Sequence, residues 1–131
     1  MTTLVLDSDG ISALAIHRTR LAELQRRGLW PPHVPSVVLT EVLTGDHRRD
    51  FAANRLLRTC KIRDVTELVA REAARLRTAT GRAGTIAATD AIVAAYASSC
   101  NAPVVLTSDP HNLRALADNA SQRISVADVN R

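Results

Sequence analysis

Four acidic residues of this 131-residue chain stand where chemistry is expected: Asp7, Glu41, Asp90 and Asp109. Asp7 directly follows an apolar run at residues 4–6, and Asp109 closely follows another at 104–106. Short runs that are apolar throughout are typical of strands buried on both faces of a parallel sheet. Ligands bind outside the carboxyl ends of such strands, so we expect the two aspartates to converge in one pocket.

Glu41 and Asp90 are expected on helices, beside apolar positions. Helical spacing places Glu41 on the flank of an apolar stripe, and Asp90 beside Val93 and Ala97. A carboxylate there is partly desolvated, which costs free energy unless a positive charge compensates. A divalent cation would compensate both, and oxygen ligands select Mg²⁺ or Mn²⁺ over zinc. The four carboxylates therefore predict a magnesium site in which manganese can substitute.

Each acidic residue also has a simpler explanation. Asp7, Asp90 and Asp109 all stand near predicted helix starts, where aspartate is a favoured cap. Glu41 has no capping role, and its simpler explanation is a surface glutamate. For any one residue these explanations stay open, but the four together favour a site.

The elements that must position these residues alternate along the chain. Strands are predicted at residues 4–6, very briefly near Val34, at 62–65, at 104–106 and, at the sheet edge, at 124–126. Helices are predicted at 11–15, 21–27, 37–43 with Ser36 as cap, 51–59, 66–79 with Thr66 as cap, 89–100 and 109–117. This alternation indicates an α/β protein, a three-layer α/β/α sandwich around a mainly parallel sheet. No linker interrupts it, so we expect a single domain over residues 1–131.

Composition supports a globular protein and allows a polyanionic partner. Hydrophobic residues make up 46% and charged residues 23% of the chain, which argues against disorder. Aromatics are only 2%, so the core must be aliphatic. The net charge is +4 and comes almost entirely from arginine, which binds phosphate in a bidentate manner. Base composition of the genome explains the arginines equally well, so the charge suits an RNA partner without establishing one.

Nothing in the sequence indicates a membrane or an oxidising compartment. Cys60 and Cys100 are isolated and lack zinc-ligand spacing, so we expect small core residues in a reducing environment. The N-terminus lacks the basic start and long apolar stretch of a signal peptide. No apolar run approaches the roughly 18 residues of a membrane span. We expect a cytoplasmic protein.

Four segments resemble the PIN-domain signature in order and spacing. They are VLDSDGI at residues 5–11, PSVVLTEVL at 35–43, TDAIVAA at 89–95 and LTSDP at 106–110. More narrowly, the chain resembles the VapC toxins of bacterial VapBC toxin–antitoxin systems, over essentially its whole length. Each motif alone is weak, but four in the right order are fairly specific.

The resemblance implies a metal-dependent endoribonuclease that forms a homodimer and is neutralised by a VapB-like antitoxin. The family's acidic quartet falls on Asp7, Glu41, Asp90 and Asp109, as catalytic and metal-binding residues. Its threonine or serine, two positions before the last aspartate, falls on Thr107. Two departures concern accessory positions: Asp9 adds an acid, and His111 and Asn112 replace an acid that relatives often carry, which puts a second metal ion in doubt.

Two other interpretations remain open. The segment from Asp7 to Gly10 also resembles the nucleophile motif of haloacid-dehalogenase-like phosphatases, in which one aspartate attacks phosphorus and another acts as acid and base. Those enzymes need a lysine before a late acidic motif, whereas the sole lysine, Lys61, stands nearly thirty residues before Asp90. The other alternative is a catalytically inactive PIN-like module that only binds a partner.

Trp30, the only tryptophan, lies among prolines and has two explanations. It covers the core under a loop, or it anchors a partner in an apolar groove, since aromatic anchors dominate binding energy at interfaces. By family resemblance, that partner would be the tail of an antitoxin.

Overall fold

Five parallel strands form the central sheet of the computed structural model, which describes residues 1–130. Their order is β3-β2-β1-β4-β5. The strands are β1 (Thr3–Leu6), β2 (His33–Pro35), β3 (Lys61–Arg63), β4 (Pro103–Thr107) and β5 (Ser125–Asp128). The sheet predicted as mainly parallel is thus parallel at every described pairing.

The two central strands come from opposite ends of the chain. In β1 and β4, Thr3 pairs with Pro103 and Leu6 with Leu106. Leu6 and Leu106 are buried because helices cover both faces of the sheet, which explains why these strands read as unbroken apolar runs. This register brings the residues that follow β1 next to those that follow β4.

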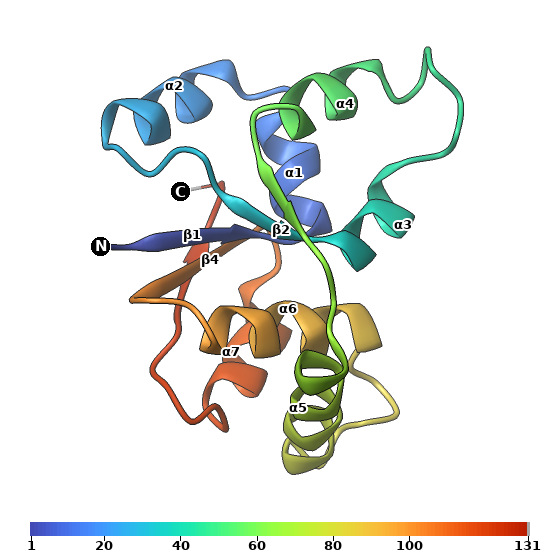
Figure 1. The fold of residues 1–131 in the computed structure, drawn as a ribbon, viewed down its shortest axis with the longest axis vertical. Helices are drawn as coiled ribbons and strands as arrows, with labels where there is room; N and C mark the ends of the chain where they lie inside the picture. The colour runs from blue at the N-terminus through green and yellow to red at the C-terminus, as the bar shows by residue number, and fades with distance from the viewer. Residues whose placement is uncertain (131) are drawn as a thin grey trace.

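Helices cover both faces of the sheet and produce the predicted three layers (Figure 1). One face carries α1 (Ser8–Leu14), α2 (Arg18–Arg26) and α4 (Phe51–Leu57), and the other carries α5 (Glu67–Ala79), α6 (Ala88–Ser98) and α7 (Pro110–Ala117). The short helix α3 (Leu39–Val42) lies beyond the carboxyl end of β2. The core between the layers is aliphatic, as predicted.

The helix predicted at 37–43 is the clearest error in the element assignment. A 3₁₀ turn, η1 (Ser36–Val38), comes first, and α3 has only four residues. Ser36 lies inside η1 and does not cap it. The β-branched pair Val37 and Val38 has low helix propensity, which disfavours a regular first turn.

Smaller differences affect other boundaries. The first helix begins at Ser8 rather than residue 11, because Asp7 caps it. The strand predicted at 62–65 runs from Lys61 to Arg63. Cys60 and Cys100 are free and half-buried, rather than fully in the core. Within residues 1–130, no helix is long and apolar enough to cross a membrane.

Candidate active site

Asp7 lies buried at the carboxyl end of β1, where it caps α1. Its Oδ1 accepts a hydrogen bond from the backbone N–H of Gly10 at 2.7 Å. Burial raises the pKa of Asp7 to about 6, although hydrogen bonds from Thr107 and Gly10 oppose the shift. The negative charges of Asp9 and Asp90 raise this pKa further. Asp7 is therefore a cap that also faces other carboxylates.

Thr107 connects the residues that follow the two central strands. It ends β4 and is fully buried. Its side chain lowers the pKa of Asp7 by hydrogen bonding to the charged form, and its Oγ1 accepts the backbone N–H of Asp109 at 3.1 Å. One hydroxyl thus acts on both the carboxylate after β1 and the backbone after β4. Asp109 stands at the N-cap of α7, but its exposed side chain makes no capping hydrogen bond.

Asp90 lies at the electrostatic centre of the acidic residues. It is half-buried in the first turn of α6, inside the helix rather than at its cap. The pKa of Asp90 is raised to about 6, first by burial and then by the charges of Glu41, Asp9 and Asp109. Acidic residues in α1, α3 and α6, and the two that follow β1 and β4, therefore lie near one another at the carboxyl edge of the sheet.

Glu41 and Asp9 differ from expectation in opposite ways. The prediction that Glu41 is partly desolvated is wrong, because α3 is a single turn at the sheet edge and leaves this side chain exposed. Its charge nevertheless reaches Asp90. Asp9 is also exposed, yet its charge acts on both Asp7 and Asp90, which places it with the other four.

The donor chemistry of this cluster suits a hard divalent cation. Oxygen is the only donor type offered, and every charge that shifts the pKa of Asp7 or Asp90 is negative. Among residues 1–130, however, no group of three or more His, Cys, Asp or Glu side chains is close enough to hold one ion. The residues fit such an ion by type and charge, and their side chains must draw closer to share it.

Asn112, one of the two residues that stand where the resemblance implies an acid, is a neutral amide. Asn112, in the first turn of α7, accepts a hydrogen bond from Arg82 Nη2 at 3.0 Å. Arg82 belongs to the connection between α5 and α6, which Arg77 also fastens by donating to the carbonyl of Ile86 at 2.7 Å. Asn112 thus anchors the segment that leads into α6 and Asp90.

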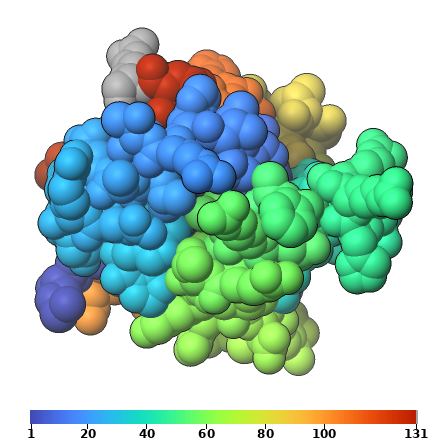
Figure 2. All heavy atoms as spheres, turned by 90° about the horizontal axis from the view of Figure 1, so that it is seen from above, coloured from blue at the N-terminus to red at the C-terminus, as the bar shows by residue number. Residues whose placement is uncertain are grey.

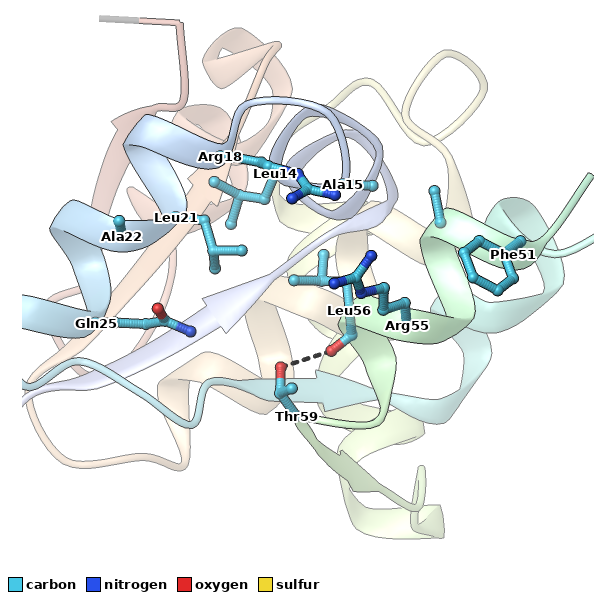
Figure 3. A pocket seen from close by; sticks show the side chains of 11 residues that line it. Leu14, Ala15, Arg18, Leu21, Ala22, Gln25, Phe51, Arg55, Leu56 and Thr59 are labelled. Carbon is cyan, nitrogen blue, oxygen red and sulfur yellow. Dashed lines mark hydrogen bonds between the residues drawn. The ribbon is translucent and has the colours of Figure 1, made fainter.

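A separate groove of about 350 Å³, with both apolar and polar lining residues, lies between α2 and α4 (Figures 2 and 3). Leu14, Leu21 and Leu56 line it, while Arg18 and Arg55 add positive charge (Figure 3). Phe51, which is 63% exposed, lines it from the start of α4.

The groove has an aromatic residue that sequence reasoning missed. Trp30 does not line it; its Nε1 donates to the Oγ1 of Thr59 at 3.0 Å, and its ring packs against the core. Phe51 is the exposed aromatic instead. Its spacing of four residues before Arg55, on a predicted helix, was the available signal.

Comparison with known proteins gives one family and a consistent fold. The PIN domain model matches residues 5–119. The DNA-bound VapBC structure from Salmonella typhimurium has a TM-score of 0.74 at 17% identity, covering 98% of this chain and 99% of that one. VapBC-1 from nontypeable Haemophilus influenzae has a TM-score of 0.73 at 17% identity, and the match covers 100% of both chains. FitAcB from Neisseria gonorrhoeae has a TM-score of 0.69 at 18% identity, covering 98% of this chain and 99% of that one.

No curated protein matches the chain. At 17–18% identity, the likeness to these solved structures concerns the fold, while the family model concerns the sequence itself.

Proposed function

Because the chain belongs to the PIN domain family, we propose that residues 1–131 form one metal-dependent endoribonuclease domain, the toxin of a toxin–antitoxin pair. The observation that carries this proposal is the effect of neighbouring carboxylates on two raised pKa values at the carboxyl edge of the sheet: Asp9 and Asp90 act on Asp7, and Asp9, Glu41 and Asp109 act on Asp90. Such an accumulation of like charge destabilises the fold and is typical of functional sites.

In the proposed mechanism, Asp7, Asp90 and Asp109 hold a Mg²⁺ or Mn²⁺ ion, and Glu41 completes the site or orients the attacking water. Bound there, the ion would activate water and stabilise charge on the scissile phosphate. Thr107 keeps the Asp7 carboxylate oriented through its hydroxyl. Asp9 adds negative charge beside Asp7 and Asp90.

The alternative phosphatase has no support in the positions of the residues. Its mechanism needs a lysine near the nucleophilic aspartate, but Lys61 lies on the exposed edge strand β3, and β2 separates that strand from β1. The inactive binding module differs from our proposal only in activity, so an assay decides between them.

The decisive experiment compares Asp90→Asn with Asp118→Asn, a matched change at an exposed position on the C-terminal end of α7. We expect Asp90→Asn to lose more RNA cleavage than the ~10–100-fold typical of groups outside the ligand shell. Asp118→Asn should retain wild-type cleavage. A folded Asp90→Asn protein that cleaves like the wild type would contradict the assignment, and a wild type that binds Mg²⁺ but cleaves no RNA would favour the inactive module.

We further propose that the groove between α2 and α4 receives a segment of the cognate antitoxin. The structures from Salmonella and Haemophilus are VapBC complexes, which supports a VapB-like partner. A groove with apolar residues, an exposed phenylalanine and two arginines suits an amphipathic segment with acidic residues. The antitoxin is expected in the adjacent upstream reading frame.

Phe51 and Trp30 make different predictions for that partner. Phe51→Ala should weaken antitoxin binding by about tenfold or more while RNA cleavage is unchanged. Trp30→Ala should act mainly by lowering stability, since its ring packs on the core. Leu68→Ala on α5, an exposed apolar side chain outside the groove, is the control and should bind normally. Equal binding by Phe51→Ala would exclude the groove.

We also propose that the protein forms a homodimer, as the family resemblance implies. Light scattering coupled to size exclusion should give twice the monomer mass at micromolar concentration. A monomer at all concentrations would reject it without affecting the assignment of the carboxylates.

A further inference from the structure

The connection between α3 and α4, residues 43–50, projects from the body of the molecule beside the carboxyl edge of the sheet (Figures 1 and 2). It begins two residues after Glu41. His47, Arg48 and Arg49 are all exposed in it. A projecting segment with this charge, next to an acidic cluster, needs a physical reason to keep its shape.

The buried carboxylate of Asp50 supplies that reason. Its Oδ1 accepts hydrogen bonds from the backbone N–H of Thr44 at 2.9 Å and from the Thr44 hydroxyl at 2.8 Å. Its Oδ2 accepts the backbone N–H of Gly45 at 2.8 Å. Burial opposes the charged form, but these hydrogen bonds outweigh it and lower the pKa of Asp50. Both ends of the connection are therefore tied to one ionised side chain.

A second carboxylate shapes the part of the connection between those ends. Asp46 Oδ1 accepts the backbone N–H of Arg48 at 2.9 Å, and that of Arg49 more weakly at 3.4 Å. The hydrogen bonds that these two acids accept come from the backbone and from the Thr44 hydroxyl, although the charge of Arg49 also lowers the pKa of Asp50. Within residues 1–130, neither Arg48 nor Arg49 forms an ion pair within 4.0 Å. The connection presents two cationic side chains on a backbone that is already ordered.

The charge of the cluster explains what these arginines would do. The neighbouring negative charges that raise the pKa of Asp90 also repel a phosphodiester, so a bound strand needs cationic contacts nearby. Guanidinium groups are suited to phosphate oxygens because they donate in a planar, bidentate manner. Ordering the backbone before binding removes part of the entropic cost of that contact.

We propose that residues 43–50 form a preformed arm that binds the RNA backbone through Arg48 and Arg49, while the carboxylate cluster faces the scissile bond. This inference rests on the proposed function and adds the element that holds the substrate. Arg48 and Arg49 lie seven and eight residues after Glu41, which keeps them within about 29 Å of it along an extended chain. We assign them contacts to phosphates other than the cleaved one, and therefore a part in binding rather than in bond breaking.

The first test measures binding of a 5′-fluorescein single-stranded RNA by anisotropy, in the full chain carrying Asp90→Asn so that no cleavage occurs. We compare Arg48→Ala/Arg49→Ala with Arg26→Ala/Arg27→Ala, an equally exposed adjacent pair at the far end of α2 (Figure 1). The arm variant should lose about tenfold affinity or more at low salt, and its log Kd against log salt slope should fall by about 1.4 for two lost contacts. The control should change less than about threefold. Equal losses would overturn the proposal.

The second test separates a fixed arm from simple charge attraction. Asp50→Ala makes the protein more positive, so charge alone predicts tighter RNA binding, whereas loss of the fixed backbone predicts weaker binding. Asp50→Asn keeps one acceptor oxygen and should restore part of the affinity. Tighter or unchanged RNA binding by a folded Asp50→Ala protein would overturn the proposal. If Asp50→Ala unfolds at the assay temperature, Asp50→Asn takes its place. We expect the RNA affinity of Asp50→Asn to lie between that of the wild type and that of Asp50→Ala.

Cleavage kinetics distinguish this inference from the proposed function. With Asp90 intact, the arm variant should raise KM while kcat stays within about twofold. If the wild type cleaves RNA and the arm variant has the same KM, the arm is wrong and the nuclease stands. If the wild type cleaves no RNA but binds it through Arg48 and Arg49, the arm stands and the nuclease is wrong.

Discussion

Asp7 and Asp90 carry similarly raised pKa values in different surroundings. Burial is the largest cause for both, but Asp7 also receives hydrogen bonds from Gly10 and Thr107, which favour its ionised form. The causes that act on Asp90 are burial and three negative neighbours. No hydrogen bond is therefore among the causes that act on the pKa of Asp90, in contrast to Asp7.

The stability of the metal-free protein should fall as pH rises from about 4.5 to 7. Both groups titrate near pH 6 in the folded state and near 3.8 in the unfolded state, so in this window the folded protein binds more protons. The free energy of unfolding then decreases with rising pH. Urea denaturation in EDTA measures this, and Asp7→Asn/Asp90→Asn should flatten the profile. An unchanged profile in that double variant would show that other groups control it.

The Thr107 hydroxyl should matter to both stability and cleavage. Thr107→Val keeps the shape but leaves the Asp109 N–H without its acceptor and removes a hydrogen bond from Asp7. We expect a loss of about 1–3 kcal/mol in urea denaturation and slower cleavage. Thr107→Ser retains the hydroxyl and should cleave like the wild type. If the serine variant is as impaired as the valine variant, packing of the methyl group is the cause.

At the residue scale, sequence reasoning succeeds where a site depends on local pattern. Asp7 and Asp109 follow apolar strands, and strand ends are readable from a few neighbouring residues. The exposure of Glu41 was not readable, because it depends on how soon α3 ends. The partnership between Glu41 and Asp90 joins residues almost fifty positions apart, and only the packed layers create it.

At the scale of elements, the approach of α1 to β4 depends on Gly10. A Cβ atom at Gly10 would clash with the backbone carbonyl oxygen of Leu106, which cannot move as a side chain could. That contact sets the first turn of α1, where Gly10 also donates to Asp7. Because residue 10 has no side chain, α1 can approach β4 closely and the Asp7 carboxylate can cap the helix.

Gly10→Ala should therefore be destabilising, against the trend for helices. Propensity alone predicts a gain of about 0.5–1 kcal/mol when alanine replaces glycine in a helix. The clash predicts a loss of about 1–3 kcal/mol and impaired cleavage. Thermal unfolding decides the sign, with Ser12→Ala on the exposed side of the same helix as control. A stabilised Gly10→Ala protein would show that α1 is free to move.

Element assignment from the sequence followed the strength of the local signals. Thr66 caps α5 as predicted, through a hydrogen bond from the Val69 N–H to its Oγ1 at 3.2 Å, because a cap depends on residues three apart. The helix predicted at residues 37–43, after β2, was wrong. Its apolar pattern fits a helix, but its β-branched residues and the exit of the chain toward the arm do not.

At the scale of the whole molecule, a divalent cation should couple activity to stability. EDTA should abolish cleavage, and Mg²⁺ or Mn²⁺ should restore it, whereas Ca²⁺ should not. The same ions should raise the melting temperature. At an ion concentration of 100 times Kd, the free energy of unfolding should increase by about 2.7 kcal/mol. Asp90→Asn should lose this thermal response. Restoration by zinc alone would indicate ligands other than this oxygen set.

The pairing of Thr3 with Pro103 has a consequence for synthesis. During translation, β1 emerges early and lacks its neighbour β4 until most of the chain has been made. Asp109 emerges later still, so the carboxylates cannot assemble on a growing chain. The carboxyl edge of the sheet is therefore completed only after β4 has been made, about a hundred residues after β1. Such long-range pairing also slows folding.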